Sequence, residues 1–206
     1  MVPAFIEQII WQKEDAAAKL RSMGLDRDKL IRVGAVAIGQ ANNVTPNFAT
    51  NAWGTLAHHY GLAELRNQFV GQIWKIDRSE NIESIIDDSN MRKVTFQNVD
   101  FAMGKCDPKP RSPKGAGAER ACEGNLGLFP DAPIYAPAIT ENYEVWSLMV
   151  DQAGNMEFSR PVVQGGTFTI CRERILLADA DDWLGPRLDG AGDGDIADDF
   201  DVEVSI

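Results

Sequence analysis

The hydrophobic pattern of the chain changes its period near residue 70, and this change constrains the fold more than any other feature. Before it, apolar residues recur at helical spacing; in residues 3–23, for example, Phe5 and Leu20 belong to one stripe. After it, short apolar runs are separated by turn residues, which is typical of strands. A run of helices followed by a run of strands indicates an α+β fold. We therefore expect N-terminal helices in residues 1–70 and a mainly antiparallel, β-rich part in residues 71–188.

Three helical segments are predicted in the first third. The first covers residues 3–23, with Gly24 as its C-terminal cap. Asp26 can cap the second, whose glycines and small residues leave helix and buried strand both open, with helix favoured. Thr45 followed by proline predicts the start of a third helix, with a break at Gly61.

Extended segments are predicted in the remainder of the chain. The clearest are three apolar runs joined by short turns, which read as an antiparallel meander. Pro161 lies in the middle run and predicts an edge strand or a bulge there, because proline cannot donate to a sheet ladder. The predicted extended segments are residues 69–76, 81–86, 91–103, 144–150, 156–163 and 167–177.

A Gly- and Pro-rich stretch over residues 104–137 predicts a long irregular loop without a regular element. Its first part, residues 105–120, is basic and predicts a solvated surface loop, a contact with an acidic partner, or a contact with phosphate. Interleaved aromatic residues are missing, so base stacking on single strands is not expected, and the acidic balance of the chain argues against general nucleic-acid binding. The candidate interaction residues here are Lys105, Lys109, Arg111, Lys114 and Arg120.

Arg172 and Arg174 are two positions apart on a predicted strand, so they should face the same side, with Arg160 on the neighbouring strand. Guanidinium groups arranged in this way can bind carboxylates with two hydrogen bonds each. The alternative is cross-strand pairing with Glu157 or Glu173.

Negative charge is concentrated near the C-terminal end of the sequence. Residues 179–203 hold ten carboxylates and one base, a net charge of −9 in a chain of net charge −11. The pattern predicts an acidic Gly/Asp linker over residues 189–199 and a strand over residues 200–206, where apolar residues alternate with polar ones. The candidate interaction residues are Asp193, Asp195, Asp198, Asp199, Phe200, Val202, Val204 and Ile206.

The chain carries no recognisable catalytic or metal-binding motif. A Gly-x-Ser-x-Gly elbow is absent, and the three cysteines are too widely spaced for a typical zinc site. Asp189 opens a stretch similar to a calcium loop, but its twelfth position is Phe200 instead of glutamate. We therefore predict no catalytic residue, no metal and no cofactor.

Composition bears on the compartment. No window approaches 18 consecutive apolar residues, the first residues lack the features of a signal peptide, and three cysteines suit a reducing environment. We expect a soluble protein without membrane contacts, made in the cytoplasm and located there or in a virion.

These features predict a non-enzymatic structural or assembly subunit that makes protein–protein contacts with itself or other subunits, in a homo-oligomer or a larger particle of virion or phage type. The acidic linker would contact the basic loop or the arginine face, and the terminal strand would add to a sheet. One alternative is an acidic regulator or inhibitor that mimics nucleic acid and binds a basic protein. A second is a metal-dependent enzyme.

Overall fold

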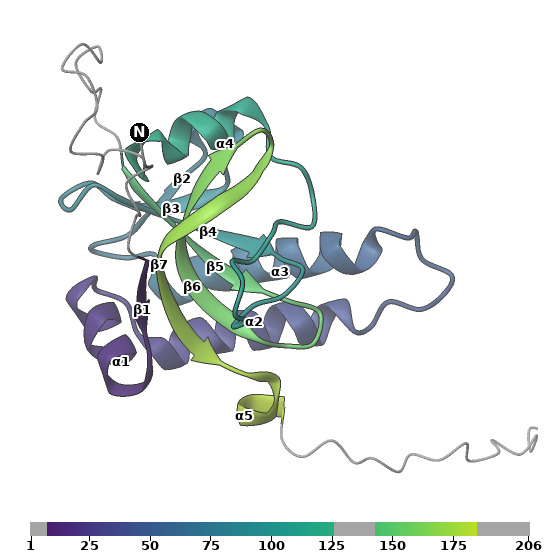
Figure 1. Ribbon diagram of the computed structural model, residues 1–206. Helices are drawn as coiled ribbons and strands as arrows, with labels where there is room; N and C mark the ends of the chain where they lie inside the picture. Colours follow the sequence, from purple (N-terminus) through teal and green to yellow (C-terminus); the bar gives the residue numbers. More distant parts are fainter. Residues whose placement is uncertain (1–7, 126–142, 185–206) are drawn as a thin grey trace, which may run out of the picture.

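The computed structural model describes residues 8–125 and 143–184, and it shows one seven-stranded mixed sheet with helices packed on it (Figure 1). The α+β class is confirmed. The helices are α1 (Lys13–Ser22), α2 (Arg27–Ala41), α3 (Ala52–Phe69), α4 (Ala116–Ala121) and α5 (Ala180–Leu184), with 3₁₀ turns η1 (Ser79–Asn81) and η2 (Cys122–Asn125). The strands are β1 (Ile9–Trp11), β2 (Lys75–Asp77), β3 (Ser84–Asp87), β4 (Arg92–Asn98), β5 (Glu144–Val150), β6 (Met156–Gln164) and β7 (Thr167–Ala178).

The sheet consists of two antiparallel meanders placed side by side. The strand order is β1-β7-β6-β5-β4-β3-β2. Strands β2 to β4 form one meander and β5 to β7 the other, and the two meet at a parallel β4–β5 pair. Strand β1 adds to β7 in parallel at the far edge. The prediction of mainly antiparallel pairing is confirmed, and β1 and β2 are the edge strands of the described sheet.

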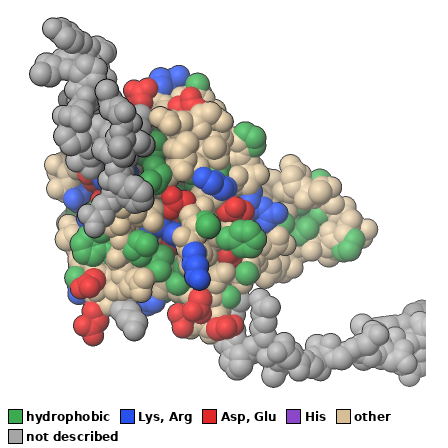
Figure 2. All heavy atoms as spheres, in the orientation of Figure 1, with side chains coloured by type: hydrophobic (Ala, Val, Ile, Leu, Met, Phe, Trp, Pro, Cys, Tyr) green, Lys and Arg blue, Asp and Glu red, His purple; other side chains and the backbone are tan. Residues whose placement is uncertain are grey.

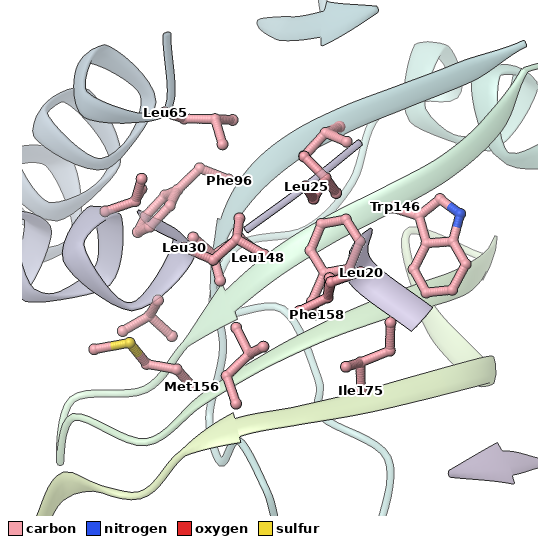
Figure 3. Packing of buried hydrophobic residues seen from close by; sticks show 14 of the residues in the cluster. Leu20, Leu25, Leu30, Leu65, Phe96, Trp146, Leu148, Met156, Phe158 and Ile175 are labelled. Carbon is pink, nitrogen blue, oxygen red and sulfur yellow. The ribbon is translucent and has the colours of Figure 1, made fainter. Parts of the chain in front are cut away.

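Helices α1, α2 and α3 cover one face of the sheet, and the larger hydrophobic core lies between these helices and the strands. Figure 3 shows its packing, with Leu20 and Leu30 from the helices close to Phe158 and Leu148 from the strands. The Trp146 and Phe158 rings stack with their centroids 5.2 Å apart. The helical and β-rich parts of the sequence therefore share one core.

The opposite face is covered by residues 99–125, and the part of this stretch from residue 104 onward belongs to the irregular loop predicted over residues 104–137. A second apolar cluster lies there, and it joins Val145 and Met149 of β5 to Val99, Ala102 and Cys122. The prediction that this stretch contains no regular element is wrong, because α4 and η2 form within it. The side chains of β5 alternate between two buried faces, so the second face also needs apolar cover.

The predicted helix over residues 3–23 is wrong over residues 8–12, and its residues 3–7 lie outside the described part of the chain. Residues 9–11 form strand β1, in which Ile9 pairs with Glu173 of β7, and the helix begins only at Lys13. Pairing with the edge of β7 favours an extended conformation here more strongly than the helical periodicity of the segment favours a helix. The second prediction is confirmed: α2 is helical, and its N-cap Asp26 accepts a hydrogen bond from the Lys29 backbone N–H at 3.0 Å.

The third helix begins later than predicted and is not broken. Thr45 and Pro46 lie in turns, with Phe48 N–H bonded to the Thr45 carbonyl, and α3 starts at Ala52. Gly61 lies inside α3 because the helix packs closely on β4 at this point. A Cβ atom at Gly61 would lie 2.5 Å from the Phe96 ring.

Pro161 lies in β6, which is an interior strand, so the predicted edge position is wrong. The predicted bulge is confirmed by a register shift between Arg160 and Pro161. The three strands of the second meander match the predicted runs, whereas β2, β3 and β4 are shorter than the extended segments predicted for them.

Candidate functional site

A cleft of about 1010 Å³ lies between α3, the turn that contains η1, the end of β4 and residues 111–118. Asn98 ties two of its walls together, because its side-chain amide donates to the Gly54 carbonyl at 2.7 Å. Gly117 lets α4 pack on the turn, since a Cβ there would lie 2.3 Å from the Glu80 carbonyl oxygen. We call this hollow the cleft; it is our candidate site.

Both histidines of the chain line the cleft. They are neighbours on α3, with ring centroids 5.9 Å apart, and the His58 ring lies 6.3 Å from that of Phe96. Burial lowers the pKa of His58, and the nearby positive charges of His59 and Lys114 lower it further, while Glu83 opposes them. The His58 imidazole is therefore neutral near pH 7.

Lys114 reaches into the cleft from the opposite wall. Its ammonium donates to the Gln97 side chain and lies 5.7 Å from the centre of the Phe168 ring. Burial lowers its pKa. Lys114 is half-buried, and within the described chain no carboxylate oxygen lies within ion-pair distance of it.

Arg111 lies at the rim of the cleft. Its guanidinium donates to the Gln152 side chain at 2.9 Å and lies 5.6 Å from the centre of the Trp53 ring. Neither neighbour carries a charge. Arg111 and Lys114 thus place two cations without a carboxylate partner, among the described residues, beside two imidazoles. This arrangement suits an anionic group such as a carboxylate or phosphate.

The other predicted basic residues differ in their surroundings. Lys105 is exposed, and Lys109 donates to the Phe168 carbonyl at 2.6 Å. Arg120 pairs with Glu80 at 2.5 Å and is neutralised there. The loop is thus held on the protein by hydrogen bonds at several of its side chains, while Lys105, Lys109, Arg111 and Lys114 have no carboxylate partner in the described residues. We call residues 105–114 the cationic segment.

The predicted arginine face does not form. Arg160 lies directly opposite Glu173 in the register, so its side chain shares the face of Glu173, and Arg174, the next residue of β7, points to the other face. A bulge follows, because the register passes from Arg160–Glu173 directly to Pro161–Cys171 and leaves Arg172 as an extra residue. The expectation that Arg172 and Arg174 lie with Arg160 on one face is therefore wrong.

The cross-strand pairing weighed as the alternative is present. Arg174 binds Glu157 through two hydrogen bonds, of 3.0 and 2.5 Å, and both side chains are buried. Arg160 pairs with Glu144 at 2.9 Å and with Glu173 at 3.4 Å. None of these residues lines the cleft.

The acidic and terminal-strand candidates lie outside the described residues. They are Asp193, Asp195, Asp198, Asp199, Phe200, Val202, Val204 and Ile206. Figure 2 shows acidic and basic side chains intermixed over the described part of one face.

The sequence reasoning missed the proximity of the histidines to Lys114. The available signal was weak: two histidines on an amphipathic helix and a lysine in a glycine-rich loop do not reveal a shared cleft.

The described residues contain no group of three or more His, Cys, Asp or Glu side chains that could hold a metal ion. Among the helices of residues 8–125 and 143–184, none is long and apolar enough to cross a membrane. Comparisons of the chain with protein-family models, curated proteins and solved structures gave no match.

Proposed function

We propose that the protein is a non-enzymatic structural or assembly subunit, in which the cationic segment and the cleft bind an acidic segment of a neighbouring polypeptide. The contact would belong to a homo-oligomer or a larger particle, and a virion or phage particle is the type we propose. The partner is then another copy of the chain or a different subunit with clustered carboxylates.

The distribution of unpaired charge carries this proposal. Most described lysine and arginine side chains outside the cationic segment lie within 4.0 Å of a carboxylate oxygen. Within it, Lys109 and Lys114 bond to neutral oxygens, and Arg111 does the same. A local excess of positive charge in a chain of net charge −11 favours an acidic partner and steers its approach.

The acidic linker of a second copy supplies matching chemistry. Residues 189–199 contain five aspartates and no base. The terminal segment, residues 200–206, could then add to an edge of the sheet by strand augmentation. Strand β2 supports this part of the proposal, because in the described sheet it pairs only with β3, and Ile76 on it is 45% exposed.

Charge reversal tests the electrostatic contact. The variant K109E/R111E should lower the native mass measured by light scattering at low salt, with a smaller difference from wild type at high salt. The variant R21E/K29E is a matched control, since both of its cations also lack a carboxylate within ion-pair distance among the described residues, and Lys29 likewise donates to a backbone carbonyl. Equal masses for wild type and both variants would contradict the proposal.

One alternative, a regulator that mimics nucleic acid, is favoured by the concentration of ten carboxylates in residues 179–203. It predicts capture of a basic, DNA-binding partner that depends on these residues and leaves the native mass unchanged when K109E/R111E is introduced.

A further inference from the structure

The described chain ends next to the cleft. Helix α5 is held against the β5–β6 turn: the Trp183 indole donates to the Gly154 carbonyl at 2.8 Å, and the Ala180 N–H donates to the Asn155 side chain at 3.1 Å. Gln152 in the same turn lines the cleft and accepts the hydrogen bond from Arg111. The acidic residues therefore follow a helix that is held at Gly154, two residues along the chain from Gln152 in the wall of the cleft.

The acidic linker is long enough to reach the cleft of its own chain. Asp193 is nine residues beyond Leu184, and an extended chain spans at most about 3.3–3.6 Å per residue, or roughly 30 Å here. Gly190, Gly192 and Gly194 impose little restriction on the path. A segment tethered this closely has an effective concentration on the order of millimolar.

The charges on the two sides are complementary. The linker brings carboxylates, and the cleft offers Arg111 and Lys114 without a carboxylate partner in the described residues. The acidic side chains that face the cleft are already engaged: Glu83 with Arg66 and Arg78, and Glu80 with Arg120. Because Glu80 and Glu83 already pair with these arginines, Arg111 and Lys114 are available to pair with an incoming carboxylate.

We infer that residues 189–199 occupy the cleft of their own chain in the isolated subunit, and that assembly exchanges this contact for the same contact between two chains. This inference rests on the proposed function, since it concerns the same surface. The same contact is made within one chain before assembly and between two chains after it, so its free energy changes little. A small additional stabilisation elsewhere in the interface is then enough to drive assembly.

A labelled deca-glutamate peptide added to the full-length chain tests the inference. In the variant D193N/D195N/D198N/D199N the linker loses most of its charge while its length is kept. Fluorescence anisotropy should show the peptide binding this variant about tenfold more tightly than wild type, because its competitor is weakened. The tenfold ratio should hold across a dilution series of the protein, since competition within one chain does not depend on concentration.

Two further variants make the outcome specific. Adding R111Q/K114Q to the neutral-linker chain should abolish peptide binding, whereas adding R21Q/K29Q should leave it unchanged. Equal peptide affinity for wild type and the neutral-linker chain would overturn the inference and leave the proposed function standing. A ratio that vanishes on dilution would also overturn it, because the competition would then be between chains. Peptide binding to neither protein would count against the proposed function itself.

Discussion

Gly61 and Phe96 are in direct contact: a Cβ atom at Gly61 would lie 2.5 Å from two atoms of the Phe96 ring, closer than any real contact of that kind. The pair joins α3 to β4 in the middle of the larger core, and Phe96 is fully buried. The absence of a side chain at Gly61 therefore sets how close the helix lies to the sheet, and it also positions His58 one turn earlier on the same helix.

The variant G61A is expected to lower the free energy of unfolding by about 1–3 kcal/mol, because the added methyl group overpacks a filled core. The variant G39A is the matched control. Gly39 is also a helical glycine, but nothing lies within 4 Å of its added Cβ, so helix propensity should raise stability by about 0.5–1 kcal/mol. Chemical denaturation measures both, and equal effects would contradict the packing argument.

The buried Glu157–Arg174 pair gives a second prediction. The variant R174M should cost about 3–5 kcal/mol, since it leaves the buried Glu157 carboxylate without its cation. Adding E157Q should restore at least about 1 kcal/mol, because the neutral amide still accepts from the Met103 N–H. Unfolding by urea provides the measurement; no recovery in the double variant would show that the carboxylate is not the source of the loss.

The three cysteines should differ sharply in reactivity. Cys106 is exposed, whereas Cys122 and Cys171 are buried. Burial raises the pKa of Cys122 to about 12; burial, followed by the charges of Asp107 and Glu157, raises that of Cys171. A thiol reagent at mildly alkaline pH should modify Cys106 rapidly and the other two only after unfolding. The variant C106S should lose the fast phase, and its persistence would show that a buried thiol is accessible.

The elements that sequence reasoning predicted best are those fixed by local signals. The N-cap Asp26 and the apolar runs of β5 to β7, which are separated by turn residues, are signals contained within a few residues of sequence, and both predictions are confirmed. Strand β1 was missed because its conformation depends on pairing with β7, more than 160 positions away in the register of Ile9 with Glu173. The hydrophobic pattern of a segment does not show which strand, so far away in the sequence, it will pair with.

The candidate site was predictable only in part. The positive charge of the cationic segment is visible in the sequence, and so is the acidic linker. The cleft is not, because it forms where α3 meets a glycine-rich segment that covers the second face of the sheet. The arginine face was not predictable, because it depends on the register between β6 and β7: Arg160 lies opposite Glu173 and so does not share a face with Arg174.

His58 should make stability depend on pH. Its pKa in the folded protein is lower than the ordinary value of 6.5, so on acidification the unfolded chain takes up the proton first. Stability should therefore fall as the pH drops through about 6.5 toward the lowered pKa, and this contribution is absent at higher pH. The positive charges of His59 and Lys114 strengthen the effect, and Glu83 weakens it.

The variant H58Q should lose this part of the pH dependence, whereas H59Q should keep most of it, because the largest cause of the lowered His58 pKa is the burial of His58 itself. Urea unfolding at about pH 7.5 and about pH 5.5 gives the comparison, with the difference between wild type and each variant isolating the histidine from other titrating groups. Binding of the deca-glutamate peptide should raise the His58 pKa by bringing negative charge into the cleft, which NMR titration of the imidazole can follow. An unchanged His58 pKa in the presence of saturating peptide would mean that the carboxylates bind outside the cleft.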